Sequence, residues 1–285
     1  MAEAFSFAGG RFHCPYRVYA SAIPGPVLIL LPALGVAARK YEAFALGLVA
    51  AGNQVLVADW PGQGESGPRP NRQLDYGYRD LVDDFVPKLL AAARQHFPQG
   101  RLVLLGHSLG GHIATLYAAA NPNAGVAVVG VACGNIHYRN WRGRHRLLTP
   151  TVALAFNLLT AIFGYLPGKA IGFGGHEARS LMRDWGRVAW SGNFDHLGLP
   201  LAPASANPTP SVFIGIAGDP FAPEASTRGL AALIQEAPAV RLLPSPRPAS
   251  ENAHSAWLRS PATVVEAVAG WLALTLGRSA IGQVV

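Results

Sequence analysis

The pentapeptide Gly-His-Ser-Leu-Gly at residues 106–110 constrains this chain more than any other stretch. An apolar run with strand character (102–105) precedes it, and a pattern rich in alanine and leucine follows it to Ala120. A strand that turns sharply into a helix holds its central serine in a strained conformation at the end of a sheet. Side chains two positions to either side would collide within the turn, which explains both glycines. The sequence therefore predicts an exposed Ser108 on a strand–helix turn.

A serine that merely caps a helix is the simpler interpretation, because glycine–serine–glycine combinations also arise by chance. The strand before and the helix after favour a nucleophile, since a nucleophilic serine of this kind needs that context. In such a turn, the backbone N–H of Leu109 points to where negative charge would develop, at the positive end of the new helix. We therefore interpret Ser108 as a nucleophile and Leu109 as one donor of an oxyanion hole.

Strand and helix patterns alternate along most of the chain. Apolar runs typical of buried strands recur, separated by helical patterns, at 26–32, 54–58, 102–105, 126–132 and 211–217. This alternation predicts an α/β fold with a mostly parallel sheet of the eight-stranded type and helices on both faces. Residues 4–19 add a β-hairpin, because two alternating runs flank a Gly-Gly turn.

The alternation stops after Cys133 and resumes at Ser211. Between them lie helical patterns interrupted by proline and glycine, notably at 147–166 and 177–191. We therefore expect three parts, of which the middle one is a helical cap inserted after the sixth strand. The first part of the core spans 1–133, the cap spans 134–210 and the second part of the core spans 211–285.

The stretch 147–166 is mostly apolar and has nearly the length of a transmembrane helix. Pro150 and Asn157 interrupt it, and strands lie on either side of the cap, so a buried or groove-lining helix is the favoured interpretation. A membrane span is the weaker alternative. A lid that contacts acyl chains or a membrane surface lies between the two.

Composition narrows the functional classes. Half of the 285 residues are hydrophobic and 14% are charged, so the chain can bury a large core. The formal charge is +7, but the basic residues follow no nucleic-acid-binding pattern, so no nucleic-acid partner is expected. Two cysteines form neither a disulfide framework nor a zinc site, and neither metal nor cofactor is expected. No signal peptide is visible, which favours the cytoplasm. The oligomeric state stays open.

A nucleophilic serine needs a base, and the base needs an orienting anion. Asp219 follows the strand at 211–217, and His254 follows a short strand near 240–243. Both therefore fall in loops after strands that come later than Ser108, in the order serine, acid, histidine. The plainer interpretations are a turn aspartate and a histidine without a role. Glu224 is the nearest rival acid.

Two further groups of residues complete the expected site. The second oxyanion donor is expected in the loop after the strand at 26–32, where the backbone N–H of Leu34 is the best candidate. In the cap, apolar residues and tryptophans favour a small-molecule substrate with an apolar or aromatic part. The tryptophans expected to line that pocket are Trp141, Trp185 and Trp190.

The chain resembles the α/β-hydrolase superfamily over nearly its whole length. The resemblance rests on Ala-Asp-Trp-Pro-Gly-Gln-Gly-Glu-Ser-Gly at 58–67, the Ser108 pentapeptide and the sequences around Asp219 and His254. Residues 138–141 and 183–190 are similar to a serine-aminopeptidase and monoglyceride-lipase-like group of predicted bacterial hydrolases. Members of the superfamily often carry His-Gly in the oxyanion loop, where this chain has Pro-Ala at 32–33.

The resemblance implies acyl transfer to water through an acyl-serine, with Ser108, Asp219 and His254 as a catalytic triad and no cofactor. Dehalogenases and epoxide hydrolases of this fold carry an aspartate in place of Ser108. A carboxylic ester is the expected substrate. A serine aminopeptidase, for which Glu177 and Asp184 would supply carboxylates, is one alternative. An acyltransferase and a catalytically silent binding protein are the others.

Overall fold

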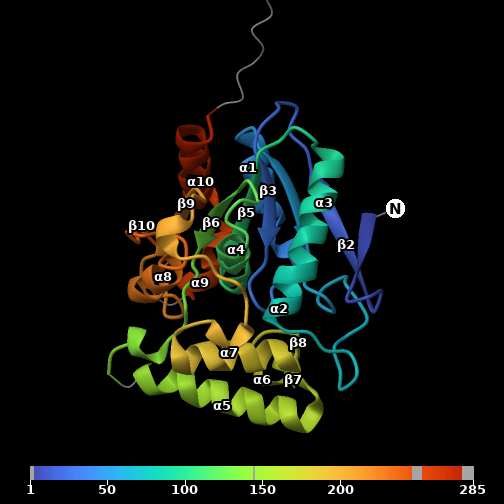
Figure 1. Cartoon of the computed structure of the whole chain (residues 1–285), viewed down its shortest axis with the longest axis vertical. Helices are drawn as coiled ribbons and strands as arrows, with labels where there is room; N and C mark the ends of the chain where they lie inside the picture. The colour runs from blue at the N-terminus through green and yellow to red at the C-terminus, as the bar shows by residue number, and fades with distance from the viewer. Residues whose placement is uncertain (1–2, 144, 246–251, 278–285) are drawn as a thin grey trace, which may run out of the picture.

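The computed structural model describes residues 3–143, 145–245 and 252–277. An eight-stranded sheet lies at its centre, in the order β1-β2-β4-β3-β5-β6-β9-β10 (Figure 1). Its strands are β1 (Glu3–Phe7), β2 (Phe12–Tyr19), β3 (Val27–Leu31), β4 (Gln54–Ala58), β5 (Leu102–His107), β6 (Val126–Val131), β9 (Ser211–Ile216) and β10 (Arg241–Leu243). β1 and β2 form an antiparallel hairpin and β2 pairs antiparallel to β4, whereas the other pairs are parallel. The predicted α/β fold is therefore confirmed.

Helices cover both faces of the sheet because side chains of each central strand alternate between two cores. Val27, Ile29 and Leu31 of β3 belong to one buried cluster, and Leu28 and Leu30 to the other. The first cluster includes residues from α3 (Val86–His96), α4 (Leu109–Ala120) and α8 (Glu224–Ala231). The second includes residues from α1 (Glu42–Ala50) and α10 (Ala262–Thr275). Short one-turn elements complete the core, namely η1 (Ala38–Tyr41), α9 (Ala253–Ala256) and η6 (Trp257–Arg259).

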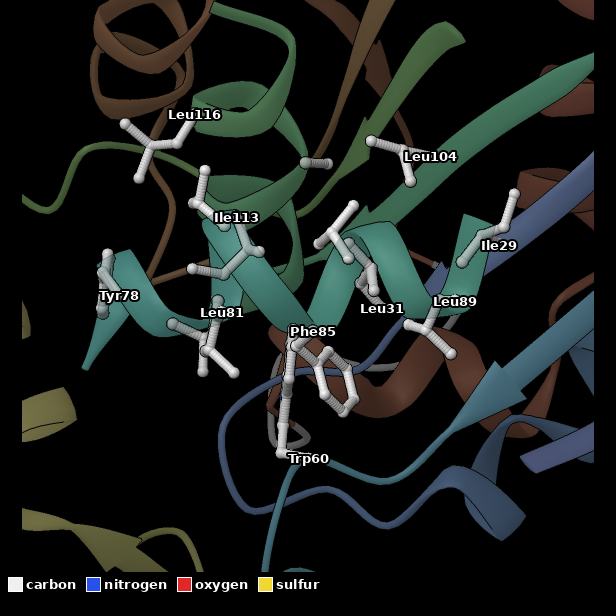
Figure 2. Packing of buried hydrophobic residues seen from close by; sticks show 14 of the residues in the cluster. Ile29, Leu31, Trp60, Tyr78, Leu81, Phe85, Leu89, Leu104, Ile113 and Leu116 are labelled. Atoms are coloured by element: carbon white, nitrogen blue, oxygen red, sulfur yellow. The ribbon is translucent and has the colours of Figure 1, made fainter. Parts of the chain in front are cut away.

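Three consecutive helical segments extend from Tyr78 to His96. α2 (Tyr78–Asp80) leads into one π-helical turn (Leu81–Phe85), which leads into α3. Pro87 lies at the start of α3 and has no backbone N–H to bond to the preceding turn, which accounts for the change in hydrogen-bond pattern. Phe85 packs with its ring centroid 5.4 Å from that of Trp60, in the same buried cluster as Leu31 and Ile113 (Figure 2).

Residues 134–210, which we call the insertion, lie between β6 and β9. Its longer elements are α5 (His145–Phe163), β7 (Tyr165–Pro167), α6 (Gly168–Ile171), β8 (His176–Ala178) and α7 (Arg179–Ser191). Three short 3-10 helices accompany them, η3 (Tyr138–Asn140), η4 (Asp195–Leu197) and η5 (Ala204–Ala206). α5 packs against α7 and lies farther from the sheet than α7 does (Figure 1).

The insertion departs from the sequence prediction in two ways. α5 ends at Phe163 rather than Leu166, because Gly164 adopts a positive φ of 83° and terminates it. Leu166 instead belongs to β7, which pairs antiparallel with β8 in a small second sheet. Strands of three residues are too short to give an alternating sequence pattern, so this pair was not predicted. The domain boundaries at 133 and 210 stay predictions.

Candidate active site

Ser108 lies at the turn between β5 and α4, with φ 53° and ψ −114°. A non-glycine residue seldom adopts a positive φ, so the tight packing of the turn must hold this conformation. A Cβ atom added at Gly106 would lie 2.2 Å from the backbone carbon of Gly110. One added at Gly110 would lie 1.9 Å from the carbonyl oxygen of Leu31. Both glycines are therefore required by close backbone contact, as the sequence predicted.

The structure brings the three predicted triad residues into one hydrogen-bonded chain. His254 Nε2 lies 2.9 Å from Ser108 Oγ, and His254 Nδ1 lies 2.8 Å from Asp219 Oδ2. Because a carboxylate only accepts hydrogen bonds, Nδ1 carries the proton and Nε2 is left to accept from the serine hydroxyl. Asp219 is 6% exposed, so its contact with the imidazole is shielded from water. This arrangement suits removal of the serine proton by His254.

Asp219 satisfies the turn interpretation and the triad interpretation together. Its Oδ1 accepts hydrogen bonds from the backbone N–H groups of Phe221 (2.8 Å) and Ala222 (3.1 Å). Its Oδ2 is thereby directed to His254. The rival acid, Glu224, lies on α8, where it is exposed and pairs with Arg228. The turn therefore orients the carboxylate that contacts the histidine.

His254 is also held through its own backbone. It lies on α9, a separate short helix before α10, where Asn252 Oδ1 accepts from the His254 N–H at 3.1 Å. Its carbonyl oxygen accepts from Trp257 Nε1 at 3.0 Å and lies 2.9 Å from His107 Nε2. The imidazole base is therefore anchored on both sides of its Cα.

His107, the residue before the nucleophile, connects the base to the predicted oxyanion loop. Its Nε2 must donate to the His254 carbonyl, so its Nδ1 accepts from the Tyr41 hydroxyl at 2.8 Å. The Tyr41 oxygen in turn accepts from the backbone N–H of Ala33 at 2.7 Å. Complete burial lowers the pKa of His107 well below its usual value, which keeps the ring neutral as this pattern requires.

His112 lies on the other side of the turn in a comparable setting. Tyr78 Oη lies 3.0 Å from its Nδ1, and Nε2 lies 2.5 Å from the carbonyl oxygen of Gly134. Burial lowers the pKa of His112 to about 4, so the ring is neutral near pH 7 and donates to Gly134. His112 and Gly134 both line the cavity described next. The hydrogen bond between them therefore fixes the start of the insertion beside Ser108.

A cavity of about 260 Å³ opens beside Ser108 and His254. Its wall includes the two predicted oxyanion residues, Leu34 and Leu109. The side chains and loops that complete it are largely apolar, with Val36, Ile136, Phe173, Trp185, Phe221 and Ala222 among them. Glycines 172 and 174 bring the insertion to the same wall. The cavity therefore lies between the core and the insertion.

Of the three tryptophans predicted to line the pocket, the structure brings only Trp185 to this cavity. Trp141 donates from Nε1 to the carbonyl oxygen of Pro220 at 2.8 Å and is not among the lining residues. Trp190 is exposed and borders a separate groove on the insertion. Only one of the three lines the cavity because they occupy different faces of the insertion. Without a helix register, these faces could not be told apart from the sequence.

The two carboxylates considered for amine binding lie outside the cavity wall. Glu177 is fully buried and accepts from the backbone N–H of Gly175 at 2.6 Å and from Gln63 Nε2 at 3.1 Å. Asp184 accepts from the backbone N–H of Tyr78 at 3.0 Å. Both therefore hold the insertion to the core.

Sequence reasoning missed the roles of Tyr41 and Phe173. Tyr41 ends the short helix η1, and Phe173 lies in the loop between α6 and β8. The Tyr41 hydroxyl gave no signal, because its two partners come from residues 33 and 107. The contact of the His107 side chain with the His254 backbone was not foreseen either.

Comparisons with known proteins agree with this architecture. A family model described as alpha/beta hydrolase fold matches residues 26–152. A soluble variant of monoglyceride lipase from Saccharomyces cerevisiae, solved with a substrate analogue, is 15% identical with a TM-score of 0.68, over 95% of this chain and 94% of that chain. Est1E from Butyrivibrio proteoclasticus, solved with ferulic acid, is 14% identical with a TM-score of 0.62, over 94% and 97%. A carboxyl esterase from Bacillus coagulans is 14% identical with a TM-score of 0.61, over 95% and 98%.

The match to the family model covers the central strands and the Ser108 turn, and the structural similarities extend over the insertion and the last strands. At these identities the solved structures speak for the fold alone. Together with the strand order and the turn geometry, they show that this chain has the alpha/beta hydrolase fold.

Proposed function

We propose that this protein is a serine hydrolase that cleaves carboxylic esters through an acyl-serine intermediate. The observation that carries the proposal is the hydrogen-bonded chain from Asp219 through His254 to Ser108, which ends at the wall of an apolar cavity. A serine so placed is activated for attack on a carbonyl carbon.

The proposed reaction proceeds in two balanced steps. His254 Nε2 takes the Ser108 proton as Oγ attacks the ester carbonyl, and then gives that proton to the departing alcohol. Water attacks the acyl-serine in the second step, again with His254 as base, and releases the acid and free Ser108. Asp219 keeps the proton on Nδ1 and stabilises the imidazolium. The N–H groups of Leu34 and Leu109 would bind the oxyanion.

The cavity wall supports an ester with an apolar or aromatic part. Phe173, Trp185 and Phe221 offer ring surfaces around Ser108. Among the described residues of the wall, none carries a carboxylate that would bind a peptide's terminal amine. Glu177 and Asp184 are engaged elsewhere, which favours an esterase over an aminopeptidase. The names of the similar structures, a monoglyceride lipase and esterases, point in the same direction.

A substrate panel tests this proposal. p-Nitrophenyl esters of increasing acyl length and feruloyl-type aromatic esters are compared with aminoacyl-anilides, using wild type and Ser108→Ala. We expect hydrolysis of the esters by wild type only, with little turnover of the anilides. Faster turnover of aminoacyl-anilides would favour an aminopeptidase, and ester turnover that survives Ser108→Ala would contradict the mechanism.

A further inference from the structure

Helix α5 exposes an unusual amount of apolar surface. Six of the thirteen large apolar side chains that the described residues expose lie on this one helix, with exposed fractions between 48% and 67%. They are Leu147, Leu148, Leu154, Leu158, Ile162 and Phe163. Four of them, Leu147, Leu154, Leu158 and Ile162, form what we call the α5 outer face. Scattered exposed apolar residues are ordinary, but a gathered patch marks a contact surface.

The helical repeat explains why this surface is continuous. Residues 147, 154, 158 and 162 follow one another at intervals of four or seven, so their side chains share one side of the helix. Residues on the opposite side, including Ala153 and Phe156, are buried on α7 and its neighbours. A helix that only covers a core needs one apolar side, and α5 has two.

α5 is the one helix among the described residues that is long and apolar enough to cross a membrane. Its inner side packs against α7, and Phe156 lies with its ring centroid 4.8 Å from that of Phe173. These contacts fix α5 along the surface of the insertion, as its outermost helix (Figure 1). A helix held in this way contacts a bilayer with one side only.

The charge of the insertion identifies the kind of bilayer. Residues 134–210 contain eight Lys and Arg and three Asp and Glu, and so carry five of the chain's seven net positive charges. Two of the three acids, Glu177 and Asp184, are buried. α5 contains no acidic residue, and Arg142 and Arg146 are exposed at its beginning. The accessible charge around the α5 outer face is therefore almost entirely positive.

A groove beside α5 adds a place for an anionic headgroup. It has a volume of about 380 Å³ and lies between Asn157 of α5 and Arg183, Arg187 and Trp190 of α7. The two arginines are exposed, one helical turn apart, and therefore point to the same side of α7. Guanidinium groups pair with phosphate oxygens, and tryptophan favours the boundary between headgroups and acyl chains.

We propose that the α5 outer face, together with Arg183 and Arg187, docks onto the surface of an anionic phospholipid bilayer. Leucine side chains would enter the acyl boundary while the arginines contact lipid phosphates. A second copy of this chain is a poorer occupant, because a two-fold interface through α5 would bring the same positive charges together. Phe156, on the buried side of the same helix, contacts the cavity residues Phe173 and Trp185, so α5 would lie between the bilayer and the cavity.

Vesicle flotation of the full chain tests this docking, with Ser108→Ala as the parent so that no turnover interferes. The vesicles are phosphatidylcholine alone or phosphatidylcholine with phosphatidylglycerol. The apolar variant is Leu154→Glu with Leu158→Glu, and the matched control is Leu274→Glu, on α10, where Leu274 is 90% exposed. The parent and the control are expected to float with the anionic vesicles, and the double variant to bind at least about tenfold more weakly.

The electrostatic contribution of Arg183 and Arg187 to vesicle binding is tested with a separate variant. Arg183→Ala with Arg187→Ala is expected to weaken binding by about fivefold per arginine, and raised salt to have the same effect. Thermal unfolding of each variant verifies its fold. Equal flotation of all variants, or no flotation of the parent, would overturn the proposal. So would a parent dimer in sedimentation velocity that the two glutamates dissociate. Flotation does not require hydrolysis, so this result and the proposed function fail separately.

Discussion

The Tyr41 hydroxyl oxygen lies 2.8 Å from His107 Nδ1 in the interior of the protein. This contact continues to the Ala33 N–H on one side and to the His254 carbonyl on the other. The loop expected to bind the oxyanion and the residue expected to act as base are therefore linked through two side chains that do not touch the reacting atoms. Both positions depend on one neutral histidine.

Tyr41→Phe tests this link, because it removes the hydroxyl and keeps the ring. The Ala33 N–H and His107 Nδ1 would lose their partner, which costs about 1–3 kcal/mol of unfolding free energy for a buried group. We expect kcat to fall by up to about 10²-fold, with a smaller change in KM. Tyr117→Phe is the control, because Tyr117 lies on α4 more than two turns beyond Ser108, and it should leave kcat near the wild-type value. Unchanged kinetics in Tyr41→Phe would show that the link does not position the site.

Asp219→Asn separates the two candidate acids. Its amide would offer a donor to His254 Nδ1, which favours the wrong tautomer, and we expect kcat to fall by about 10⁴-fold. Glu224→Gln is the matched control, because Glu224 is exposed and pairs with Arg228. Steady-state ester hydrolysis measures both. A large loss in Glu224→Gln with little change in Asp219→Asn would reverse the assignment.

Gly35→Ala tests how closely the insertion contacts the predicted oxyanion loop. A Cβ atom at Gly35 would lie 2.2 Å from Gly174 Cα, and Gly35 itself has a positive φ of +68°. Gly9 has nearly the same φ, +67°, but open space around it, so Gly9→Ala carries the backbone strain of about 1–2 kcal/mol alone. We expect Gly9→Ala to retain activity and Gly35→Ala to lose stability and kcat/KM together. Equal behaviour of the two variants would mean that the loops separate freely.

Glu177 gives a pH dependence of stability. Burial raises its pKa from 4.5 to about 7, so between these values the folded protein holds more protons than the unfolded chain. The contribution of Glu177 to the unfolding free energy therefore falls as the pH rises from about 4.5 through 7. The complete loss amounts to about 3 kcal/mol.

Glu177→Gln removes this ionisation, and denaturant unfolding at pH 5 and pH 8 measures the effect. From pH 5 to pH 8, the unfolding free energy of the variant should rise relative to that of wild type by up to about 3 kcal/mol. The unfolding free energy of wild type has to be subtracted from that of the variant at each pH. The subtraction is needed because the lowered pKa of His112 makes the stability of both proteins rise with pH over part of the same range. A constant difference between the two proteins at both pH values would contradict the assignment.

The core and the site differ in how far the sequence could predict them. The turn around Ser108 and the loops of Asp219 and His254 follow from local chemistry and strand order, and the sequence placed all three. The pocket-lining part of the insertion depends on helix register and on three-residue strands. The sequence alone therefore could not distinguish Trp185, which lines the cavity, from Trp141 and Trp190, which do not. The contact between Tyr41 and His107 joins residues 66 apart. No short sequence pattern carries information of that kind.

The central claim is that Ser108 is a nucleophile activated by His254, and active-site labelling tests it most directly. A fluorophosphonate probe should label wild type stoichiometrically, with the adduct located on Ser108 by mass spectrometry. Ser108→Ala should show no labelling, and His254→Ala should react far more slowly, since the base is gone. Absence of labelling in folded wild type, or an adduct on another serine, would contradict the account.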